Sequence, residues 1–368
     1  MSAPIDEPNA KLLRAIIQAG PRNFSLLSRI TGMPAETVRY KIKKQLASKG
    51  IYIHAISDAT KFDLQRITVR MKFTEKYHPV SKSILQALHE LSYLTYYSGE
   101  LMTRWYYCMF QVPSKFAREF SEFLDAMSEL GILESYVLRP IDWINHISMR
   151  PEFFDLHRGM WDIDWAQLKL LDDLPKVSAD QADGSEFDKT DLLITKELTI
   201  DSLTTVAEMS KKLNVNVKTL QYHYGSHLLE RGMIRNFVVR WMGDVESARK
   251  HKIVYLRLYF KDLNRKDMES TRRTMYTLPF TWSEIISDNR RLFVSEAGVP
   301  VEQLVDCRYF LNNYLGELAD GVEERMVDGT SSMAFTVPHG LYDSESRLWT
   351  YPLEQNVSRL QNLVQAFN

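Results

Sequence analysis

Residues 31–42 read TGMPAETVRYKI, and this stretch carries the clearest structural signal in the chain. Gly32 is suited to end one helix, and Pro34 fits the first turn of the next because its missing N–H has no helical partner there. Val38 and Ile42 then share one apolar face, with basic residues on the other. A tight turn between a short helix and a basic helix is typical of a helix-turn-helix, whose second helix enters the major groove of DNA.

The residues on either side complete a helical unit. Residues 9–19 and 25–30 each place apolar side chains at helical spacing, and the third helix runs to Gly50. Seven lysine and arginine residues and one acid lie between Arg22 and Lys49, so the unit is locally basic although the net charge of the chain is −1. Such side chains neutralise phosphates and read base edges. The predicted DNA contacts are Arg22, Ser25, Glu36, Thr37, Arg39, Tyr40, Lys41, Lys43 and Lys44.

The chain contains this unit twice. A shift of 182 positions aligns residues 6–51 with residues 188–233 without a gap, and a shift of 187 positions aligns much of the sequence after each of these blocks. The repeated unit therefore covers residues 6–165 and again 188–353, joined by a polar linker at 174–187.

The second copy of the third helix carries fewer positive charges than the first. Its predicted DNA contacts are Lys218, Thr219, Gln221, Tyr222 and His223. His223 and His227 are four residues apart on one helical face, which is the spacing of a possible metal pair. No third ligand is evident in the neighbouring sequence, so we expect these histidines to face solvent or DNA and predict no metal site.

Each helical unit is followed by strands and helices in the order βαββαβ. Residues 65–73 alternate apolar and polar side chains as a half-buried strand does, and residues 78–91 have helical spacing. The remaining elements are strands at 93–98, 104–112 and 133–138 and a helix that begins at Pro113. This order predicts a ferredoxin-like layer of two helices on a four-stranded antiparallel sheet, and an α+β fold class.

The predicted domains follow from this pattern. They are a winged helix-turn-helix domain at 1–60, a ferredoxin-like domain at 61–150, a helical arm and linker at 151–187, a second winged helix-turn-helix domain at 188–245, a second ferredoxin-like domain at 246–338, and a C-terminal arm with an amphipathic helix at 339–368.

The two arms match each other. Phe153-Phe154-Asp155 with Trp161 corresponds to Leu341-Tyr342-Asp343 with Trp349. We expect each of these aromatic arms to pack against the core of its own unit.

Composition limits the possible classes of protein. No apolar run reaches the roughly 18 residues of a membrane span. Cys108 and Cys307 are the only cysteines, which argues against disulfides and a cysteine zinc site and fits a reducing cytoplasm. The chain has no phosphate-binding glycine loop, no HExxH and no GxSxG motif. We therefore expect no cofactor and no enzymatic activity.

The order of helix-turn-helix, wing and βαββαβ module resembles the Lrp/AsnC family of prokaryotic transcription factors, in a tandem-duplicated form. Residues 31–42 are similar to the family's turn and recognition helix, and Ser98-Gly99-Glu100 is similar to a Gly-Asp turn near its effector pocket. In the second copy, residues 285–287 lack that glycine. The resemblance implies a transcriptional regulator that binds double-stranded DNA, with Gly99 and Glu100 contacting an amino acid or another small-molecule effector.

The same resemblance implies association through the ferredoxin-like modules. Two units in one chain can form an internal pseudo-dimer, or each unit can pair with a second chain to give a homodimer or a larger homo-oligomer. The sequence does not choose between these arrangements.

Two other functions remain open from the sequence. Siroheme decarboxylases have the same duplicated architecture and use histidines near the second and third strands of the ferredoxin-like module, but residues 96–107 and 282–294 contain none. Proton transfer near neutral pH usually recruits histidine or a tuned carboxylate, so the sequence disfavours this interpretation. The other alternative is a structural or interaction protein with vestigial helix-turn-helix domains.

Overall fold

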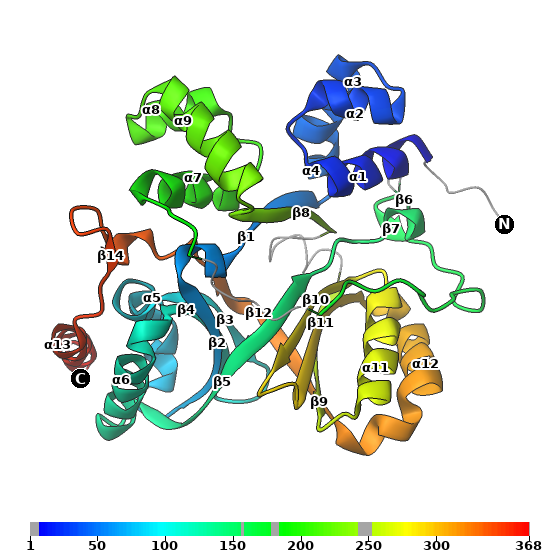
Figure 1. Ribbon diagram of the computed structural model, residues 1–368. Coiled ribbons are helices and arrows are strands. Elements are labelled where there is room, and N and C mark those ends of the chain that lie inside the picture. The colour runs from blue at the N-terminus through cyan, green and yellow to red at the C-terminus, as the bar shows by residue number, and fades with distance from the viewer. Residues whose placement is uncertain (1–6, 156–157, 178–183, 242–251, 368) are drawn as a thin grey trace.

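The computed structural model describes residues 7–155, 158–177, 184–241 and 252–367, and it has the mixed α+β composition that the sequence predicts. Both halves of the chain run through the same order of elements, a group of helices and one strand followed by βαββαβ (Figure 1). The predicted boundary at residues 245–246 and the middle of the predicted linker lie outside the described residues.

The elements have the following bounds. The first half contains α1 (Glu7–Ala19), α2 (Phe24–Thr31), α3 (Ala35–Tyr40), the π-helical η1 (Lys41–Gln45), α4 (Leu46–Ser48), β1 (Ile51–Ser57), η2 (Ala59–Phe62), β2 (Leu64–Phe73), η3 (His78–Val80), α5 (Ser81–Ser92), β3 (Leu94–Glu100), β4 (Trp105–Pro113), η4 (Ser114–Phe116), α6 (Ala117–Glu129), β5 (Leu133–His146), η5 (Pro151–Phe153), β6 (Phe154–Asp155) and β7 (Met160–Trp161). The second half contains α7 (Lys189–Ile200), α8 (Val206–Leu213), α9 (Val217–Tyr222), the π-helical η6 (His223–Glu230), β8 (Ile234–Trp241), β9 (Ile253–Lys261), α11 (Arg265–Thr277), β10 (Thr281–Ser287), β11 (Leu292–Pro300), η7 (Val301–Gln303), α12 (Leu304–Leu315), η8 (Gly316–Gly321), β12 (Val322–Ala334), η9 (His339–Leu341), β13 (Tyr342–Asp343), β14 (Leu348–Trp349) and α13 (Leu353–Gln365). No helix among these combines the length and apolarity needed to cross a membrane.

The long strands of both halves form one closed antiparallel barrel in the order β10-β11-β9-β12-β3-β4-β2-β5. The halves join where β5 pairs with β10 and where β12 pairs with β3. Helices α5 and α6 cover one side of the barrel, and α11 and α12 cover the other (Figure 1). Because successive side chains of a strand point to opposite faces, each strand sends one set toward these helices and the other set into the barrel.

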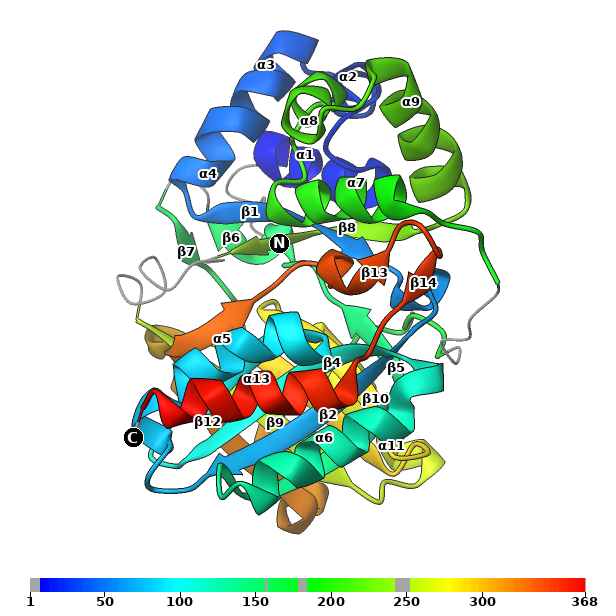
Figure 2. The same cartoon turned by 90° about the vertical axis from the view of Figure 1, so that its left-hand side faces the viewer.

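A separate two-stranded sheet lies between the barrel and the helices at the top of the molecule (Figures 1 and 2). In this sheet β1 pairs with β8 in antiparallel register, from Ile51 opposite Trp241 to Ser57 opposite Ile234. The strand that follows the helix-turn-helix in each half is therefore hydrogen-bonded to its counterpart in the other half.

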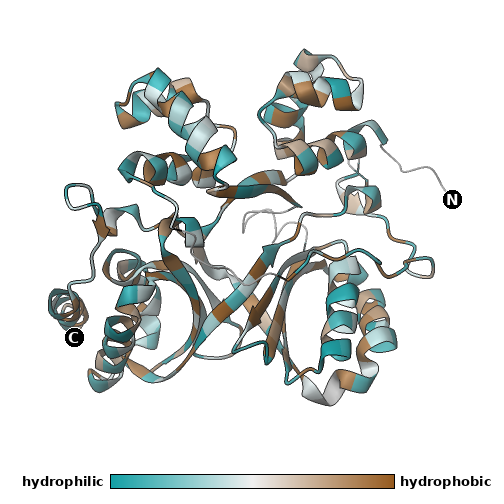
Figure 3. Cartoon of the chain, in the orientation of Figure 1, coloured by the Kyte–Doolittle hydropathy of each residue, from teal (hydrophilic) through white to brown (hydrophobic). Residues whose placement is uncertain are grey.

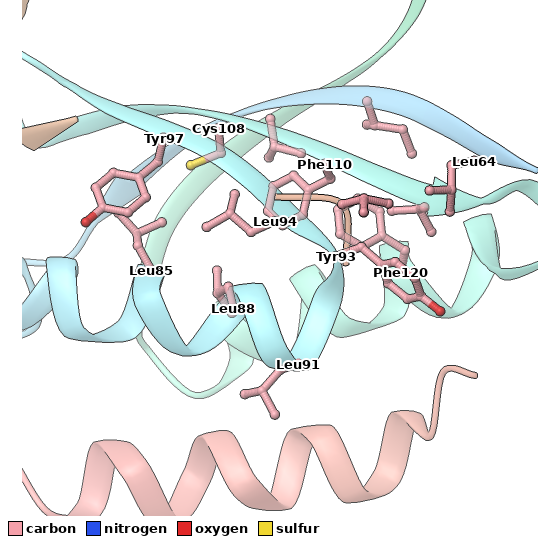
Figure 4. Packing of buried hydrophobic residues seen from close by; sticks show 14 of the residues in the cluster. Leu64, Leu85, Leu88, Leu91, Tyr93, Leu94, Tyr97, Cys108, Phe110 and Phe120 are labelled. Carbon is pink, nitrogen blue, oxygen red and sulfur yellow. The ribbon is translucent and has the colours of Figure 1, made fainter. Parts of the chain in front are cut away.

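The hydrophobic cores also cross between the halves. Leu192 and Leu198 of α7 belong to the core that packs on the barrel strands of the first half. Leu12 and Ile16 of α1 belong to the core that packs on the barrel strands of the second half. Figure 3 shows hydrophobic residues along the barrel strands and polar residues on the outer turns of the helices. Figure 4 shows the first of these cores, where buried side chains of α5 lie against aromatic residues of the sheet. Each core therefore needs both halves of the chain.

Each aromatic arm contacts both halves of the chain, so the prediction that it packs against its own unit describes only part of its contacts; within the second half, Lys189 donates to the Tyr342 carbonyl oxygen at 3.2 Å. The Trp161 ring centroid lies 5.7 Å from that of Trp241 and 5.8 Å from that of Phe280. Trp349 donates its indole N–H to the carbonyl oxygen of Phe62 at 2.8 Å. The reason that the first arm crosses between the halves is that the later residues of β5 pair with β10 of the second half. The chain that follows β5 is thereby brought over the second half.

The C-terminal amphipathic helix is confirmed as α13. It lies along α5 and α6 (Figure 2), with Leu360 and Val364 buried.

Two strands of the first half are longer than predicted. The strand predicted at 133–138 continues to His146, because its later residues pair with β10.

Gly99 and Glu100 end β3, and the turn follows them at residues 101–104. Gly99 lies opposite Asp328 of β12, and a Cβ atom here would come within 3.0 Å of the Ser331 Cβ. Glycine therefore allows the close approach of two strands at this point.

Candidate functional site

A cavity of about 580 Å³ lies between the barrel interior and the β1–β8 sheet. This volume is in the range of small-molecule sites, roughly 300–1,000 Å³. Both halves of the chain line it, with side chains from β1 and β8 and from all eight barrel strands. The charged and titratable groups on its wall are His54, Arg66, Tyr96, His146, Arg240, Tyr255, Arg257 and Glu296.

Arg257 and Glu296 face each other across β9 and β11 and form an ion pair. The Arg257 Nη2 lies 2.6 Å from the Glu296 Oε1 and also donates to the Ser98 Oγ at 2.9 Å. The guanidinium lies over the Tyr107 ring, 3.7 Å from its centroid, and its side chain is 0% exposed. Burial opposes ionisation of Glu296, but the charge and hydrogen bonds of Arg257 outweigh it and lower the pKa of this carboxyl. Glu296 is therefore ionised at neutral pH.

Arg240 enters the cavity from β8 without a carboxylate partner among the described residues. Its Nη2 donates to the His146 Nδ1 at 3.1 Å and to the Trp282 carbonyl oxygen at 3.2 Å. Because arginine can only donate, His146 Nδ1 must be unprotonated, and the neutral ring carries its proton on Nε2. Burial lowers the pKa of Arg240, but arginine titrates so far above neutrality that it keeps its charge.

Both cavity histidines are held in the neutral form. Burial, helped by the charge of Arg240, lowers the pKa of His54 from 6.5 to about 4. Burial and the surrounding arginines lower the pKa of His146 well below its ordinary value. A neutral imidazole can accept a proton or bind a metal ion. His54 therefore offers a neutral ring to the cavity, whereas the lone pair of His146 is already occupied by the hydrogen bond from Arg240 and its Nε2–H is a donor.

The wall of the cavity has an excess of positive charge. Arg66, Arg240 and Arg257 are cationic, and Glu296 is the anion that faces them. Within the described residues, the Arg240 Nε and the Arg257 Nη1 are buried without a hydrogen-bond acceptor. Buried charges ordinarily require partners. The cavity is thus suited to a ligand that carries carboxylates.

Tyr96 adds a hydroxyl to the same wall. Burial raises the pKa of Tyr96, so its hydroxyl stays protonated at neutral pH. The cavity therefore combines cationic anchors, neutral imidazoles and a protonated hydroxyl donor.

Most residues predicted to contact DNA lie at the surface of the paired helical groups. Tyr40 is 63% exposed, and the Arg39 side chain is 54% exposed with an ion pair to Glu36 at 3.6 Å. Thr37 is half-buried. The remaining exposed members of the predicted set are Ser25, Lys43, Lys44, Lys218, Thr219, Gln221 and Tyr222.

Three predicted contacts are turned away from that surface, because each is bound within the protein. Arg22 donates to the Thr204 carbonyl oxygen at 2.7 Å and lies over the Tyr224 ring, so it joins the two helical groups. Lys41 donates to the Asn9 Oδ1 at 2.7 Å. His223 is buried against the carboxylate of Asp191.

The predicted effector residues line a separate cavity of about 340 Å³. Glu100 is buried, and both of its carboxylate oxygens accept hydrogen bonds from Arg70, at 3.0 and 2.9 Å. Its charge is therefore already matched within the protein.

The sequence prediction missed the residues of the central cavity. His54, Arg240 and Arg257 each stand alone as polar residues within apolar strands, in IYIHAIS, FVVRW and IVYLRLYF. A single charged or titratable side chain within an otherwise apolar strand indicates that the strand faces a polar cavity inside the protein. Histidines were considered only near the second and third strands of each module, where residues 96–107 and 282–294 contain none, whereas the histidines of the cavity come from β1 and β5.

Comparison with known proteins adds information about the fold. No protein-family model matches the chain, and no curated protein matches it. Two solved structures of the siroheme decarboxylase NirDL, one of them in complex with an iron-uroporphyrin III analogue, match with a TM-score of 0.55 and 12% identity. These matches cover 98% and 97% of this chain and 100% and 99% of the NirDL chains. The structure of E. coli AsnC matches 37% of this chain and 91% of its own, with 15% identity and a TM-score of 0.28.

The full-length matches overturn the prediction that the chain is not an enzyme, because the protein that they match from end to end is a decarboxylase. At this identity the likeness concerns the fold. The chain therefore has the fold of NirDL.

Proposed function

We propose that the chain binds a carboxylated tetrapyrrole in the central cavity and removes carboxyl groups from it, as a siroheme decarboxylase does. The observation that carries this proposal is the buried, positively charged cavity between the halves of a chain that has the NirDL fold throughout. The function predicted first from the sequence, transcriptional regulation, becomes the second candidate.

Arg240 is the anchor that we assign to a carboxylate of the ligand. Its guanidinium has no described carboxylate partner, and a carboxylate at this place would accept the hydrogen bonds that Arg240 otherwise leaves unmade. Arg66 supplies a second positive charge on the same wall, although it also donates to the Ser57 carbonyl oxygen at 2.9 Å. Arg257 is matched by Glu296 and serves mainly to keep the barrel interior polar.

Decarboxylation also needs a proton. The bond between the carboxyl carbon and its neighbour breaks, carbon dioxide leaves, and the electron pair stays on the remaining carbon, which then takes a proton. Tyr96 keeps its hydroxyl proton at neutral pH and is the donor that we assign. His54 is neutral and would be the ring suited to hold the metal of a bound macrocycle, while His146 keeps its lone pair on Arg240.

A visible-range titration of the full chain with iron-uroporphyrin III tests binding. We expect a saturable, one-to-one spectral shift, and we expect Arg240→Met to weaken binding by about 10-fold to 100-fold through loss of a charge-assisted pair. Arg118→Met is the matched control, because Arg118 lies exposed on α6 with Glu122 as its partner. Absence of a stoichiometric shift, or an equal affinity of the two variants, contradicts the proposal.

Catalysis is tested with siroheme under reducing, anaerobic conditions. We expect products lighter by the mass of one or more carbon dioxide molecules, measured by mass spectrometry. Tyr96→Phe should slow turnover by about 100-fold, the range of a general acid, while leaving the binding titration unchanged. A Tyr96→Phe variant with full activity removes Tyr96 from the mechanism.

DNA binding is the second candidate function. It is favoured by the exposed basic face of the first helix-turn-helix, where Arg39, Lys43 and Lys44 lie at the surface beside Tyr40. The duplex would be bound by both helical groups together, with any small-molecule effector acting through Gly99 and Glu100 or through the central cavity.

Footprinting on the promoter region of the chain's own gene, at several salt concentrations, tests this second function. We expect Arg39→Ala with Lys43→Ala to lower the affinity for DNA. The slope of the logarithm of the binding constant against the logarithm of the salt concentration should become shallower by about two, one for each lost phosphate contact. Unchanged affinity and slope would rule out DNA binding by this face.

We further propose that the chain is a tandem duplication of one unit, with the domain boundaries predicted from the sequence. The matching element order of the two halves supports this. The pairing of β5 with β10 and of β12 with β3 supports an internal pseudo-dimer over a homo-oligomer formed through sheet edges.

A further inference from the structure

The second helical group contains a cluster of metal-ligating side chains that the proposed function does not use. His223 and His227 lie on η6, and both direct Nδ1 toward the carboxylate of Asp191 on α7. The Nδ1 atoms are 2.8 and 3.0 Å from the Asp191 Oδ1, and the possible ligand atoms of the three residues all lie within 4.8 Å of one another. The structure therefore supplies the third ligand that the sequence did not reveal.

The cluster is shielded from solvent. The side chains of Asp191, His223 and His227 are 0%, 11% and 13% exposed. The Asp191 Oδ2 accepts the backbone N–H of Asp188 at 3.0 Å, and within the part of the chain that the structure describes no lysine or arginine forms an ion pair with this carboxylate. A buried carboxylate without a cationic partner is unfavourable unless a cation or several donors compensate it.

The first half shows what occupies the same place when histidine is absent. The shift of 182 positions aligns Asn9 with Asp191, Lys41 with His223 and Gln45 with His227. The Lys41 Nζ donates to the Asn9 Oδ1 at 2.7 Å and to the Gln45 Oε1 at 3.1 Å. A positively charged group thus bridges the first helix and the π-helical segment in the first half. In the second half the residues at these positions change together, to one carboxylate and two imidazoles.

We propose that Asp191, His223 and His227 bind one divalent transition-metal ion of the zinc type. Two imidazole nitrogens and one carboxylate oxygen are the ligands that such ions favour, and water would complete a tetrahedral set. Tetrahedral zinc at ordinary bond lengths separates its ligand atoms by roughly 3.3 Å, so the two histidine–aspartate separations of 2.8 and 3.0 Å need to widen by only a few tenths of an ångström.

The ion would link α7 to the third helix of the second helix-turn-helix, as the Lys41 ammonium links α1 to η1 in the first. The π-helical form of η6 brings the ligands to α7 in the same way as the shorter π-helical η1 brings Lys41 to α1. Such local changes of helix type often occur at functional positions. The inference does not depend on tetrapyrrole binding, since the cluster lies outside the residues that line the central cavity.

The test uses the full chain, treated with a chelator and free of any histidine tag. Titration with Co²⁺ should give visible absorption bands typical of tetrahedral nitrogen and oxygen ligands, saturating at one ion per chain. Zn²⁺ should abolish the bands, and equilibrium dialysis with elemental analysis should give the same stoichiometry. His227→Gln should weaken binding by roughly 100-fold or more, since it removes a direct ligand.

Two designed variants separate metal binding from folding. Asp191→Asn with His223→Lys and His227→Gln installs the first half's own set, so the protein should stay folded by circular dichroism and bind no metal at this site. The reciprocal change, Asn9→Asp with Lys41→His and Gln45→His, should raise the stoichiometry from one ion to two. A wild-type chain that takes up no Co²⁺, or a folded first variant that takes up as much as wild type, overturns the proposal.

Discussion

Two histidines on the wall of the central cavity, His54 and His146, carry much of the chemistry that the site can perform. Each is neutral because burial and nearby arginines disfavour the imidazolium, and Arg240 fixes the tautomer of His146. Neither ring would keep this state on an exposed surface, where histidine titrates near neutrality. The environment, more than the residue type, therefore decides their role.

The low pKa of His54 makes the stability of the protein depend on pH. Below its ordinary pKa of 6.5 the unfolded chain takes up a proton at this residue, whereas the folded chain does so only near pH 4. The unfolded state thus binds more protons in this window, and the free energy of unfolding falls as pH is lowered from about 6.5 to about 4. We expect His54 to account for on the order of 1–3 kcal/mol of that loss.

Chemical denaturation of wild type and His54→Gln at a series of pH values measures this contribution. The variant should lose less stability than wild type between pH 6.5 and pH 4. Parallel curves for the two proteins would show that His54 does not titrate in this way.

Single residues were only partly predictable from the sequence. The exposure of Arg39, Tyr40, Lys43 and Lys44 follows from helical spacing, and the structure agrees with it. The inward turn of Arg22 and Lys41 depends on partners far away in sequence, Thr204 and Asn9, so spacing alone could not reveal it.

Helices and strands were predicted with more success than the individual contacts. Local periodicity identifies α1, α5, α6 and α13, because one face of each helix must be apolar. It does not reveal that β5 continues to His146, since that extension is formed by pairing with β10 of the other half. Nor does it show which half an aromatic arm will cover.

The arm around β14 offers a direct measurement of this packing. Trp349 is 4% exposed against Phe62, Tyr93 and Phe187 of other segments. We expect Trp349→Ala to lower the free energy of unfolding by about 3–5 kcal/mol, through the cavity and the lost hydrogen bond. Leu348→Ala is the neighbouring control, because Leu348 is 54% exposed and should cost less than about 0.5 kcal/mol. Equal denaturation midpoints for the two variants would contradict this packing.

Across the entire chain, the closed barrel makes the two halves dependent on each other. Without the second half, β3 and β5 would be open sheet edges, and the first core would lose α7 and α13. Exposed edges and apolar surface promote association. The sequence repeat predicts two similar halves, but a repeat alone cannot distinguish two independent units from one barrel shared between them.

Separate expression of residues 1–177 and 184–368 tests this dependence. We expect neither half to remain a soluble monomer and the two halves to associate when co-expressed. The full chain should scatter light as a single species of 42.9 kDa and unfold in one transition. Two soluble, independently folding halves would contradict the shared barrel and would favour separate units.

The ribbon formed by β1 and β8 connects the central cavity to the two helical groups. His54 and Arg240 extend from it into the cavity below, while the strands themselves hold the two helical groups side by side above. The backbone hydrogen bonds of this ribbon and the Arg22 contact with the Thr204 carbonyl oxygen together fix the spacing of the two helical groups. A ligand in the cavity beneath this ribbon would contact both of its strands, and each strand leads directly into one helical group.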